Sequence, residues 1–265
     1  MKRLRHFTAV AAMLAIVLSF GGCDAGGDVT DTTNGVGNPF SGTPTEQTPT
    51  SVTIAGKSYN TGLTKLELKG EYLTSEDIEP LRHMVNLREL DLHDNEITDI
   101  SVLSGLTKLR ELNLYNNNIA DISPLSGLVE LEKLRLYNNN IVDISPLSGL
   151  VDLRELYISN NEIDDISPLN KLISLELLGL SDNKIVDISP LSELPKLRNG
   201  LSDSGLGLSN NLITDISVFV NGFIALETVN LDGNPIEDWS FATEGDYNGV
   251  WFLEREDGTK IEIYA

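Results

Sequence analysis

Side chains that carry out acid–base or nucleophilic chemistry are scarce in this chain of 265 residues. It has three histidines and one cysteine, and it contains no HExxH, GxSxG or glycine-rich phosphate-binding pattern. His93 stands near Asp91 and Asp94, residue types that can exchange a proton between an imidazole and a carboxylate. Acidic residues are so numerous that such neighbours arise by chance, and a solvated polar face is the stronger interpretation. We therefore predict no enzyme activity, no metal site and no cofactor.

The charge balance excludes one class of partner. Lys and Arg total 19 against 40 Asp and Glu, which gives a formal net charge of −21. Nucleic-acid binding depends on clustered basic side chains that neutralise phosphates, so we do not expect nucleic acid as a partner. A single cysteine cannot form an internal disulfide. The fold must therefore be held together by its apolar residues, which make up 40% of the chain.

That one cysteine, Cys23, follows an export-type leader in residues 1–22. Three basic residues precede the 14 apolar or small residues of 7–20, a stretch too short to span a membrane comfortably. Two glycines then lead into Cys23, and the whole arrangement resembles a bacterial lipoprotein signal peptide. The resemblance implies cleavage before Cys23 and lipidation of its thiol. An ordinary secretory signal with an incidental cysteine and an uncleaved membrane anchor are the alternatives.

Residues 23–50 are predicted to form a disordered tether. Gly, Thr, Asp, Asn and Pro dominate this segment, so it cannot bury enough apolar surface to offset the entropy lost on ordering. As a flexible coil it would reach about 30 Å. Together with the lipoprotein resemblance, this predicts an exported protein of the cell envelope, lipid-anchored to a membrane on the cell-surface or periplasmic side.

An internal repeat of 22 residues predicts the fold of the remaining chain. Five copies run without a gap through residues 85–194, for example TKLRELNLYNNNIADISPLSGL at 107–128, and less regular copies precede and follow them. Their shared pattern L-x-x-L-x-L-x-x-N-x-I is the leucine-rich repeat signature. We expect an α/β-type leucine-rich repeat solenoid, or horseshoe, of about eight coils. A parallel sheet would line its concave face, with 3₁₀ or short turns on the return side and small hairpin caps.

One asparagine per coil falls where the chain must turn sharply after its strand. Its amide can bond backbone groups that would otherwise be unsatisfied inside the solenoid. We predict that these residues form a structural ladder: Asn95, Asn117, Asn139, Asn161, Asn183, Asn211 and Asn234.

The repeat resembles the internalin type of bacterial leucine-rich repeat, both in its 22-residue period and in its ITDISPLSGL-like return segment. This resemblance covers roughly residues 51–240. It implies a curved right-handed solenoid that binds other molecules, often proteins, through its concave face. The variable positions between the leucines would determine the ligand, and the resemblance does not name it.

Residues 22 apart should be neighbours on adjacent strands, so the side chains of the concave face can be placed in columns. The columns bring together three of the seven tyrosines, one arginine and several charged residues in the third to fifth coils. We predict that they form a ligand-binding patch, since tyrosine and arginine dominate binding hot spots. A protein ligand is favoured and a glycan is the alternative, and the oligomeric state is not predicted. The patch comprises Tyr115, Tyr137, Tyr157, Arg135, His93, Lys133 and Glu111. In the alternative interpretation, the tyrosines only stack on one another while Glu111, Lys133 and Glu155 pair around them.

The return segments carry the pattern D-I-S-P-L. A serine before a proline predicts an N-cap at a short helix, and the preceding aspartates should form a column along the solenoid. A calcium ladder is conceivable there, but one carboxylate per coil supplies too few oxygens. Bonding to the adjacent turn is therefore the preferred role.

The ends of the repeat array require caps. Residues 51–84 are predicted to form an N-terminal cap with a degenerate first repeat. It would consist of a small hairpin and a first return helix capped by Thr74 or Ser75. The repeats would occupy 85–240. Residues 241–265 should form a C-terminal cap hairpin around Asp257-Gly258, with Trp239, Trp251 and Phe252 covering the last coil. The insertion 198–205 is interpreted as a tolerated loop, or alternatively as a contributor to binding.

These observations predict an envelope-tethered binding module that recognises a protein or peptide through its concave face. A structural lipoprotein that spaces envelope components without a discrete groove ligand is the alternative, and an enzyme is the least favoured class.

Overall fold

The computed structural model describes residues 49–198, 206–221, 226–240, 242–245, 250–254 and 260–264. The predicted signal peptide, Cys23, nearly all of the tether and residues 199–205 of the insertion lie outside these ranges. The described ranges belong to one compact unit, residues 47–265. In them, no helix combines the length and the apolar character needed to cross a bilayer.

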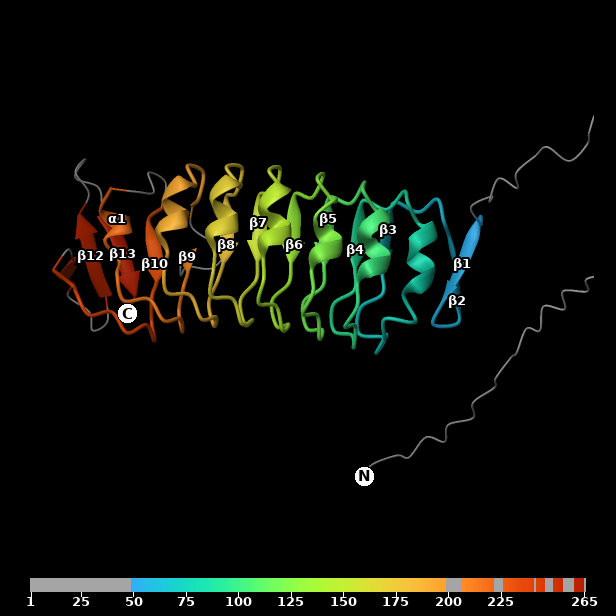
Figure 1. The fold of residues 1–265 in the computed structure, drawn as a ribbon, viewed down its shortest axis with the longest axis horizontal. Coiled ribbons are helices and arrows are strands. Elements are labelled where there is room, and N and C mark those ends of the chain that lie inside the picture. Colours follow the sequence, from blue (N-terminus) through green and yellow to red (C-terminus); the bar gives the residue numbers. More distant parts are fainter. Residues whose placement is uncertain are drawn as a thin grey trace, which may run out of the picture. The chain divides into compact units, whose positions relative to one another are not determined.

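The described residues form the predicted leucine-rich repeat solenoid, in which a strand and a short helix alternate along the chain (Figure 1). Eight strands lie side by side in chain order and pair in parallel. They are β3 (Lys65–Glu67), β4 (Glu89–Asp91), β5 (Glu111–Asn113), β6 (Lys133–Arg135), β7 (Glu155–Tyr157), β8 (Leu177–Gly179), β9 (Leu206–Gly207) and β10 (Thr228–Asn230).

The pairing register follows the repeat. From β4 to β8 each residue pairs with the residue 22 positions further on, as in Leu112 with Leu134. Between β8 and β9 the paired residues are Gly179 and Gly207, a separation of 28 that contains the six extra residues of the insertion. The register of the sheet is therefore kept across the insertion.

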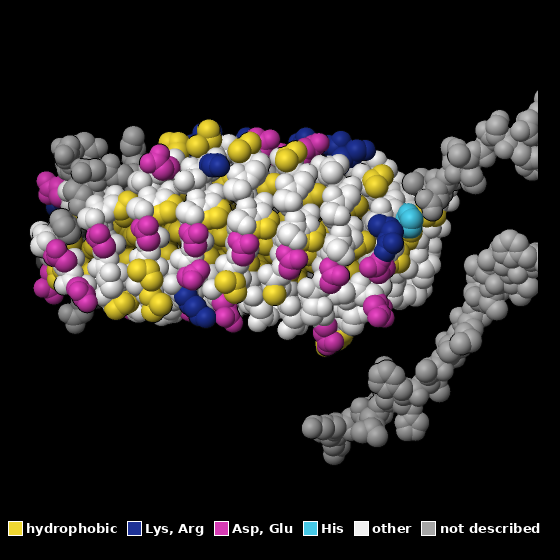
Figure 2. Space-filling model, in the orientation of Figure 1, with side chains coloured by type: hydrophobic (Ala, Val, Ile, Leu, Met, Phe, Trp, Pro, Cys, Tyr) yellow, Lys and Arg dark blue, Asp and Glu magenta, His cyan; other side chains and the backbone are white. Residues whose placement is uncertain are grey.

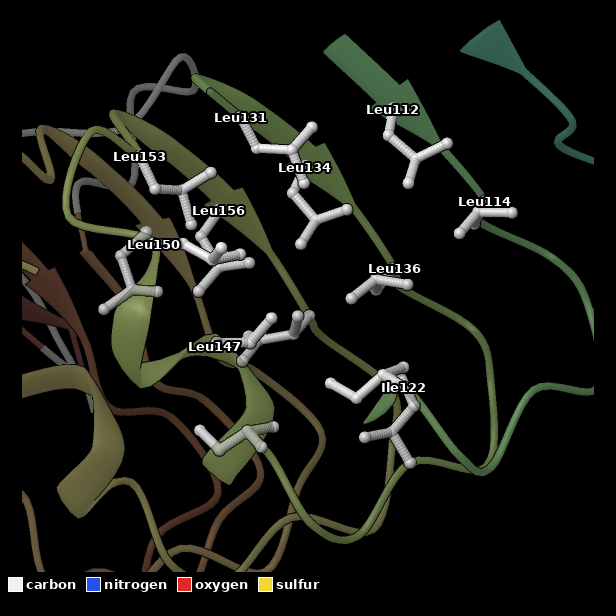
Figure 3. Packing of buried hydrophobic residues seen from close by; sticks show 14 of the residues in the cluster. Leu112, Leu114, Ile122, Leu131, Leu134, Leu136, Leu147, Leu150, Leu153 and Leu156 are labelled. Atoms are coloured by element: carbon white, nitrogen blue, oxygen red, sulfur yellow. The ribbon is translucent and has the colours of Figure 1, made fainter. Parts of the chain in front are cut away.

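Burial of leucine and isoleucine explains why each coil closes. A coil such as residues 129–150 places seven of these side chains in the core, with exposures of 0–1%. Figure 3 shows equivalent leucines from successive coils, such as Leu112, Leu134 and Leu156, lying one above another. Each fully buried leucine contributes about 1.5–3 kcal/mol relative to an exposed one.

The return side consists of short 3₁₀ helices, as predicted. They are η1 (Glu79–His83), η2 (Ser101–Gly105), η3 (Ser123–Leu125), η4 (Ser145–Gly149), η5 (Ser167–Lys171) and η6 (Ser189–Glu193); the four-residue α1 (Val218–Asn221) follows in the seventh coil. The predicted serine N-caps were wrong. Ile122 occupies the N-cap position of η3 without a side-chain cap bond, and Ser123 is the first helical residue. The Ser123 hydroxyl, which would have to cap the helix, instead donates to Asp121 Oδ2 at 3.0 Å.

The predicted capping of the first return helix by Thr74 or Ser75 was also wrong. Helix η1 begins at Glu79, with Ile78 at its N-cap. The Thr74 hydroxyl bonds Asp77 Oδ2 at 2.7 Å instead. The Ser75 hydroxyl accepts the backbone N–H of Asp99 in the next coil, at 2.8 Å.

Both ends carry the expected hairpins. At the N-terminal end, β1 (Ser51–Ile54) and β2 (Lys57–Asn60) pair antiparallel across Ala55-Gly56, whose φ angles of 48° and 77° fit a tight turn. At the C-terminal end, β12 (Val250–Glu254) pairs antiparallel with β13 (Lys260–Tyr264); the Asp257-Gly258 turn lies outside the described ranges.

The C-terminal hairpin does more than cover the last coil. Strand β13 pairs in parallel with β10, and β11 (Ala242–Glu244) adds to β12, so the sheet continues into the cap. Trp239 and Trp251 stack with ring centroids 4.7 Å apart and pack against the core. Phe252, which was expected beside them, has Lys260 over its ring at 5.9 Å.

Candidate functional site

The asparagine ladder fixes the segment that follows each strand. Asn139 shows the arrangement: its Oδ1 accepts the Ile119 N–H at 3.0 Å, and its Nδ2 donates to the carbonyls of Leu114 and Leu136, both at 3.0 Å. Asn95, Asn117, Asn161, Asn183 and Asn211 repeat these bonds and are buried, while Asn234 makes them in a partly buried position. In the first coil Glu71 replaces the asparagine and pairs with Lys57 at 2.8 Å.

A second, outer ladder lies next to the first. The residue before each ladder asparagine has a left-handed φ of 52–57°, from Asp94 to Asn210. Asn160 Nδ2 donates to Asn138 Oδ1 at 2.6 Å, and Asn210 Nδ2 donates to Asp182 Oδ1 at 2.8 Å. The two ladders hold the edge of the concave face rigid, and the predicted ligand residues project from this support.

The strand register brings the charged residues of the patch together. Glu111, Lys133 and Glu155 are direct neighbours on β5, β6 and β7. Lys133 Nζ lies 3.8 Å from Glu111 Oε1 and 3.4 Å from Glu155 Oε1. Arg135, in the next column, lies 3.8 Å from Glu155 Oε2. Glu155 therefore shares two cations, a role that its position in the sequence columns had indicated.

Three of the predicted residues form a continuous ring stack. His93 stacks on Tyr115 with centroids 4.2 Å apart, and Tyr115 stacks on Tyr137 at 4.3 Å. Tyr157 does not join the stack. It stands in the neighbouring column with the Arg135 guanidinium 5.7 Å from its ring centroid. The seven residues of the predicted patch thus lie together. The features of the alternative interpretation, stacked tyrosines and ion pairs around Lys133, are also present among them.

His93 is held firmly at one end of the stack. Its Nδ1 lies 2.5 Å from Asp91 Oδ1, and its Nε2 lies 3.5 Å from Asp94 Oδ2. Asn113, which the sequence interpretation left out of the patch, places Nδ2 3.2 Å from the same Nδ1. The imidazole is only 14% exposed, so its contacts orient the ring and leave it little access to a substrate.

Two tyrosine hydroxyls of the patch, those of Tyr137 and Tyr157, stay protonated at neutral pH because their pKa values are raised. Burial raises the pKa of Tyr137 to about 12, with a further contribution from Tyr115. Burial also raises the pKa of Tyr157, and Glu155 adds to this effect while Arg135 opposes it. The Tyr157 hydroxyl is buried and has no hydrogen-bond partner among the described residues. The patch therefore presents the stacked rings of Tyr115 and Tyr137, whereas the Tyr157 hydroxyl is not accessible.

The strands β3 to β6 also surround a hollow, which the sequence did not predict. It is open to solvent, with an empty volume of about 370 Å³ that includes part of that solvent. Asp91 and Asn113 in its wall contact His93 of the ring stack. Its walls are Lys65, Leu66, Glu67, Glu89, Leu90, Asp91, Glu111, Leu112, Asn113 and Arg135. The column positions could have indicated which residues line the hollow. Its depth depends on the conformations of their side chains, which the sequence does not show.

The aspartate column lies on the opposite face, where Figure 2 shows a row of acidic side chains over the short helices. Asp121 Oδ1 accepts the Ser123 N–H and Oδ2 accepts the Ser123 hydroxyl, at 2.8 and 3.0 Å. These two bonds, the backbone one first, lower the pKa of Asp121. Each aspartate thus bonds its own turn, two residues on. In the described ranges, no three His, Cys, Asp or Glu side chains come together as metal ligands would.

Comparison with known proteins agrees with this geometry. The family model described as "Leucine Rich repeats (2 copies)" matches residues 85–127 and 129–171. Internalin C2 from Listeria monocytogenes is 33% identical with a TM-score of 0.62, and the match covers 70% of this chain and 80% of that one. The chain belongs to the internalin-like leucine-rich repeat proteins. Proteins of this fold generally mediate protein–protein interaction and are typically not enzymes.

Two further solved structures resemble this internalin-like chain. A leucine-rich repeat protein of Leptospira interrogans is 31% identical with a TM-score of 0.52, and the match covers 60% of this chain and 40% of that one. The ectodomain of a membrane receptor kinase from Arabidopsis thaliana, at 23% identity and a TM-score of 0.54, shares the fold over 65% of this chain and 21% of its own. A search of the curated proteins gives no significant match.

Proposed function

We propose that this internalin-like protein is an envelope-tethered binding module that recognises a protein or peptide through its concave face. The observation that carries the proposal is the stack of His93, Tyr115 and Tyr137, just beyond the ends of β4, β5 and β6, with Arg135 over the Tyr157 ring beside it. Aromatic and arginine side chains held in place by neighbours give large contact area at little further entropy cost. The Arabidopsis ectodomain, solved in complex with Casparian strip integrity factor 2, is an example of the fold in a complex.

The rigid support of the patch favours a recognition role. The two asparagine ladders and the parallel register fix the backbone beneath Tyr115, Tyr137 and Tyr157. A ligand would therefore meet side chains that are already ordered, which lowers the cost of binding. The Tyr157 hydroxyl is buried without a partner among the described residues, so a ligand would contact the exposed part of this ring and not its hydroxyl.

The tethering part of the proposal rests on the N-terminal sequence. Residues 1–22 would be removed, Cys23 would carry the lipid, and 24–50 would hold the repeats away from the membrane. Multiple acyl chains give stable anchoring, because each buried CH₂ contributes about 0.8 kcal/mol. Incorporation of radiolabelled fatty acid, lost in Cys23→Ala, tests this directly; incorporation that persists in the variant would contradict it.

The recognition part is tested by the triple variant Tyr115→Ala/Tyr137→Ala/Tyr157→Ala in crosslinking capture on intact cells. We expect loss of the captured protein. A matched control changes three exposed apolar residues outside the patch, Tyr72, Val142 and Val186, to alanine; it should capture normally. Circular dichroism should show both variants folded. If the folded tyrosine variant captures the protein as well as the wild type does, the patch is not the binding site. A structural protein that spaces envelope components would then be favoured.

A further inference from the structure

The ring stack of the patch ends at Tyr137. His93, Tyr115 and Tyr137 stack with centroids 4.2 and 4.3 Å apart and with interplanar angles of 14° and 10°. In the part of the chain that the structure describes, Tyr137 stacks on no ring besides Tyr115. The face of the Tyr137 ring that is turned away from Tyr115 is therefore not covered by a further ring of these residues.

The backbone register that builds the stack continues past its last ring. The Asn116 N–H donates to the Tyr137 carbonyl at 3.0 Å, and one coil further on the Asn138 N–H donates to the Ser159 carbonyl at 3.0 Å. Ser159 therefore has the same relation to Tyr137 as Tyr137 has to Tyr115. A serine side chain carries no ring, so the place for a fourth ring of the stack is above Ser159. Tyr137 and Ser159 are both half-buried, so part of each is accessible to solvent.

The residues beyond Ser159 are small as well. Ser181 follows Ser159 in the same column, because the Asn160 N–H donates to its carbonyl at 2.9 Å. In the neighbouring column the position after Tyr157 is Gly179, which has no side chain. On its far side, a ring stacked on Tyr137 would therefore meet small side chains.

The opposite end of the stack is different. Lys69 precedes His93 in the column, because the Gly70 N–H donates to the His93 carbonyl at 3.0 Å. Lys69 has a long side chain, whose Nζ lies 3.4 Å from Glu67 Oε2. The imidazole of His93 is only 14% exposed. The Tyr137 end is therefore the end at which a further ring can join the stack.

We propose that an aromatic side chain of the protein partner stacks on the uncovered face of Tyr137, above Ser159. This inference rests on the proposed function and adds the chemistry of the anchor. Stacked aromatic pairs are more favourable than the apolar area that they bury would suggest. Tyr137 is already held by Tyr115, so little additional order is required of the protein when the ligand ring binds. The near-parallel geometry that occurs twice in this column favours an aromatic ring over the puckered ring of a sugar.

The test uses the full chain and the peptide acetyl-Gly-Gly-Trp-Gly-Gly-amide in an NMR titration. We expect saturable binding, with upfield ring-current shifts at the Ser159 β-protons and at the Tyr137 ring. The same peptide with cyclohexylalanine in place of tryptophan keeps a bulky apolar side chain but has no aromatic face. It should bind at least about threefold more weakly and cause no ring-current shifts. N-acetylglucosamine should cause no shifts at these two residues.

A variant that covers the face of Tyr137 gives a second measurement. In Ser159→Leu an aliphatic side chain would occupy the place of the fourth ring, so binding of the tryptophan peptide should weaken by about fivefold or more. Capture of the protein partner on intact cells should also be lost. The matched control is Ser209→Leu, in the same column two strands further on and about 10 Å away. It should leave peptide binding within about twofold, and circular dichroism should show both variants folded.

Several outcomes would overturn the proposal. They are equal weakening by the two leucine variants, equal binding of the cyclohexylalanine peptide, and absence of shifts at Ser159. Shifts caused by N-acetylglucosamine at Ser159 and Tyr137 would assign the face to a glycan instead. If the tryptophan peptide fails to bind while the tyrosine triple variant still abolishes capture, the anchor is wrong and the proposed function stands. If the peptide binds as expected but the triple variant captures normally, the proposed function is wrong, and so is the assignment of this face to a protein partner.

Discussion

Replacing one inner-ladder asparagine should destabilise the solenoid far more than replacing its exposed neighbour. In Asn139→Ala the Ile119 N–H loses its side-chain acceptor and becomes a buried, unsatisfied donor. The carbonyls of Leu114 and Leu136 lose one donor each but keep a second, from Asn117 and Asn161. An orphaned buried group costs about 1–3 kcal/mol, and each lost bond to a retained carbonyl about 0.5–1 kcal/mol. The free energy of unfolding should therefore fall by roughly 2–5 kcal/mol.

Urea unfolding followed by circular dichroism measures this loss. With a slope of about 1–3 kcal/mol per molar urea, the midpoint should fall by about 1 M or more. The matched control is Asn140→Ala, one residue on, whose exposed side chain makes no hydrogen bond in the described part of the chain; it should change stability by less than about 0.5 kcal/mol. If the two variants unfold at the same urea concentration, the ladder does not satisfy the backbone as argued.

Three other predictions follow from individual contacts. Tyr137→Phe should reduce the rise in absorbance at 295 nm near pH 12; the stability that the raised pKa of Tyr137 confers is full below about pH 10 and falls as the pH rises through 12. Tyr157, whose pKa is also raised, keeps part of the high-pH signal, so a rise of unchanged amplitude near pH 12 would contradict the assignment. NMR titration should place the pKa of Asp121 below the ordinary aspartate value, so its contribution to stability is present at neutral pH and lost as the pH falls through that lowered pKa; an ordinary value would refute the turn bond. Trp239→Ala should lower the free energy of unfolding by about 2–4 kcal/mol, because it removes the ring stacked on Trp251, and an unchanged urea midpoint would show that the cap does not depend on it.

The 22-residue period predicted most of the fold, because a segment of 22 residues can close a coil around buried leucines in only a few ways. The spacing of leucines and the asparagine fixed strand, turn and return segment in every copy, and the structure confirmed the parallel sheet and the 3₁₀ returns. The helix starts were wrong because the serine hydroxyl has a competing partner. The serine of D-I-S-P-L can cap a helix through its hydroxyl, but in Ser123 the hydroxyl donates to the carboxylate of Asp121, two residues earlier. The joining of β13 to β10 was missed because a long-range parallel pairing leaves no mark in either segment.

The candidate site was only partly predictable, and Tyr157 shows why. The column arithmetic correctly made it a neighbour of Arg135, but whether a ring joins the stack depends on the room beside it. Gly179 occupies the next position in its column, and a Cβ there would lie 3.3 Å from Tyr157 Cδ1. The glycine thus leaves space for the Tyr157 ring to lie against β8, out of line with His93, Tyr115 and Tyr137. In Gly179→Ala the Tyr157 ring would have to shift by a few tenths of an ångström to make room for the new Cβ, so the missing side chain at Gly179 helps determine where that ring lies.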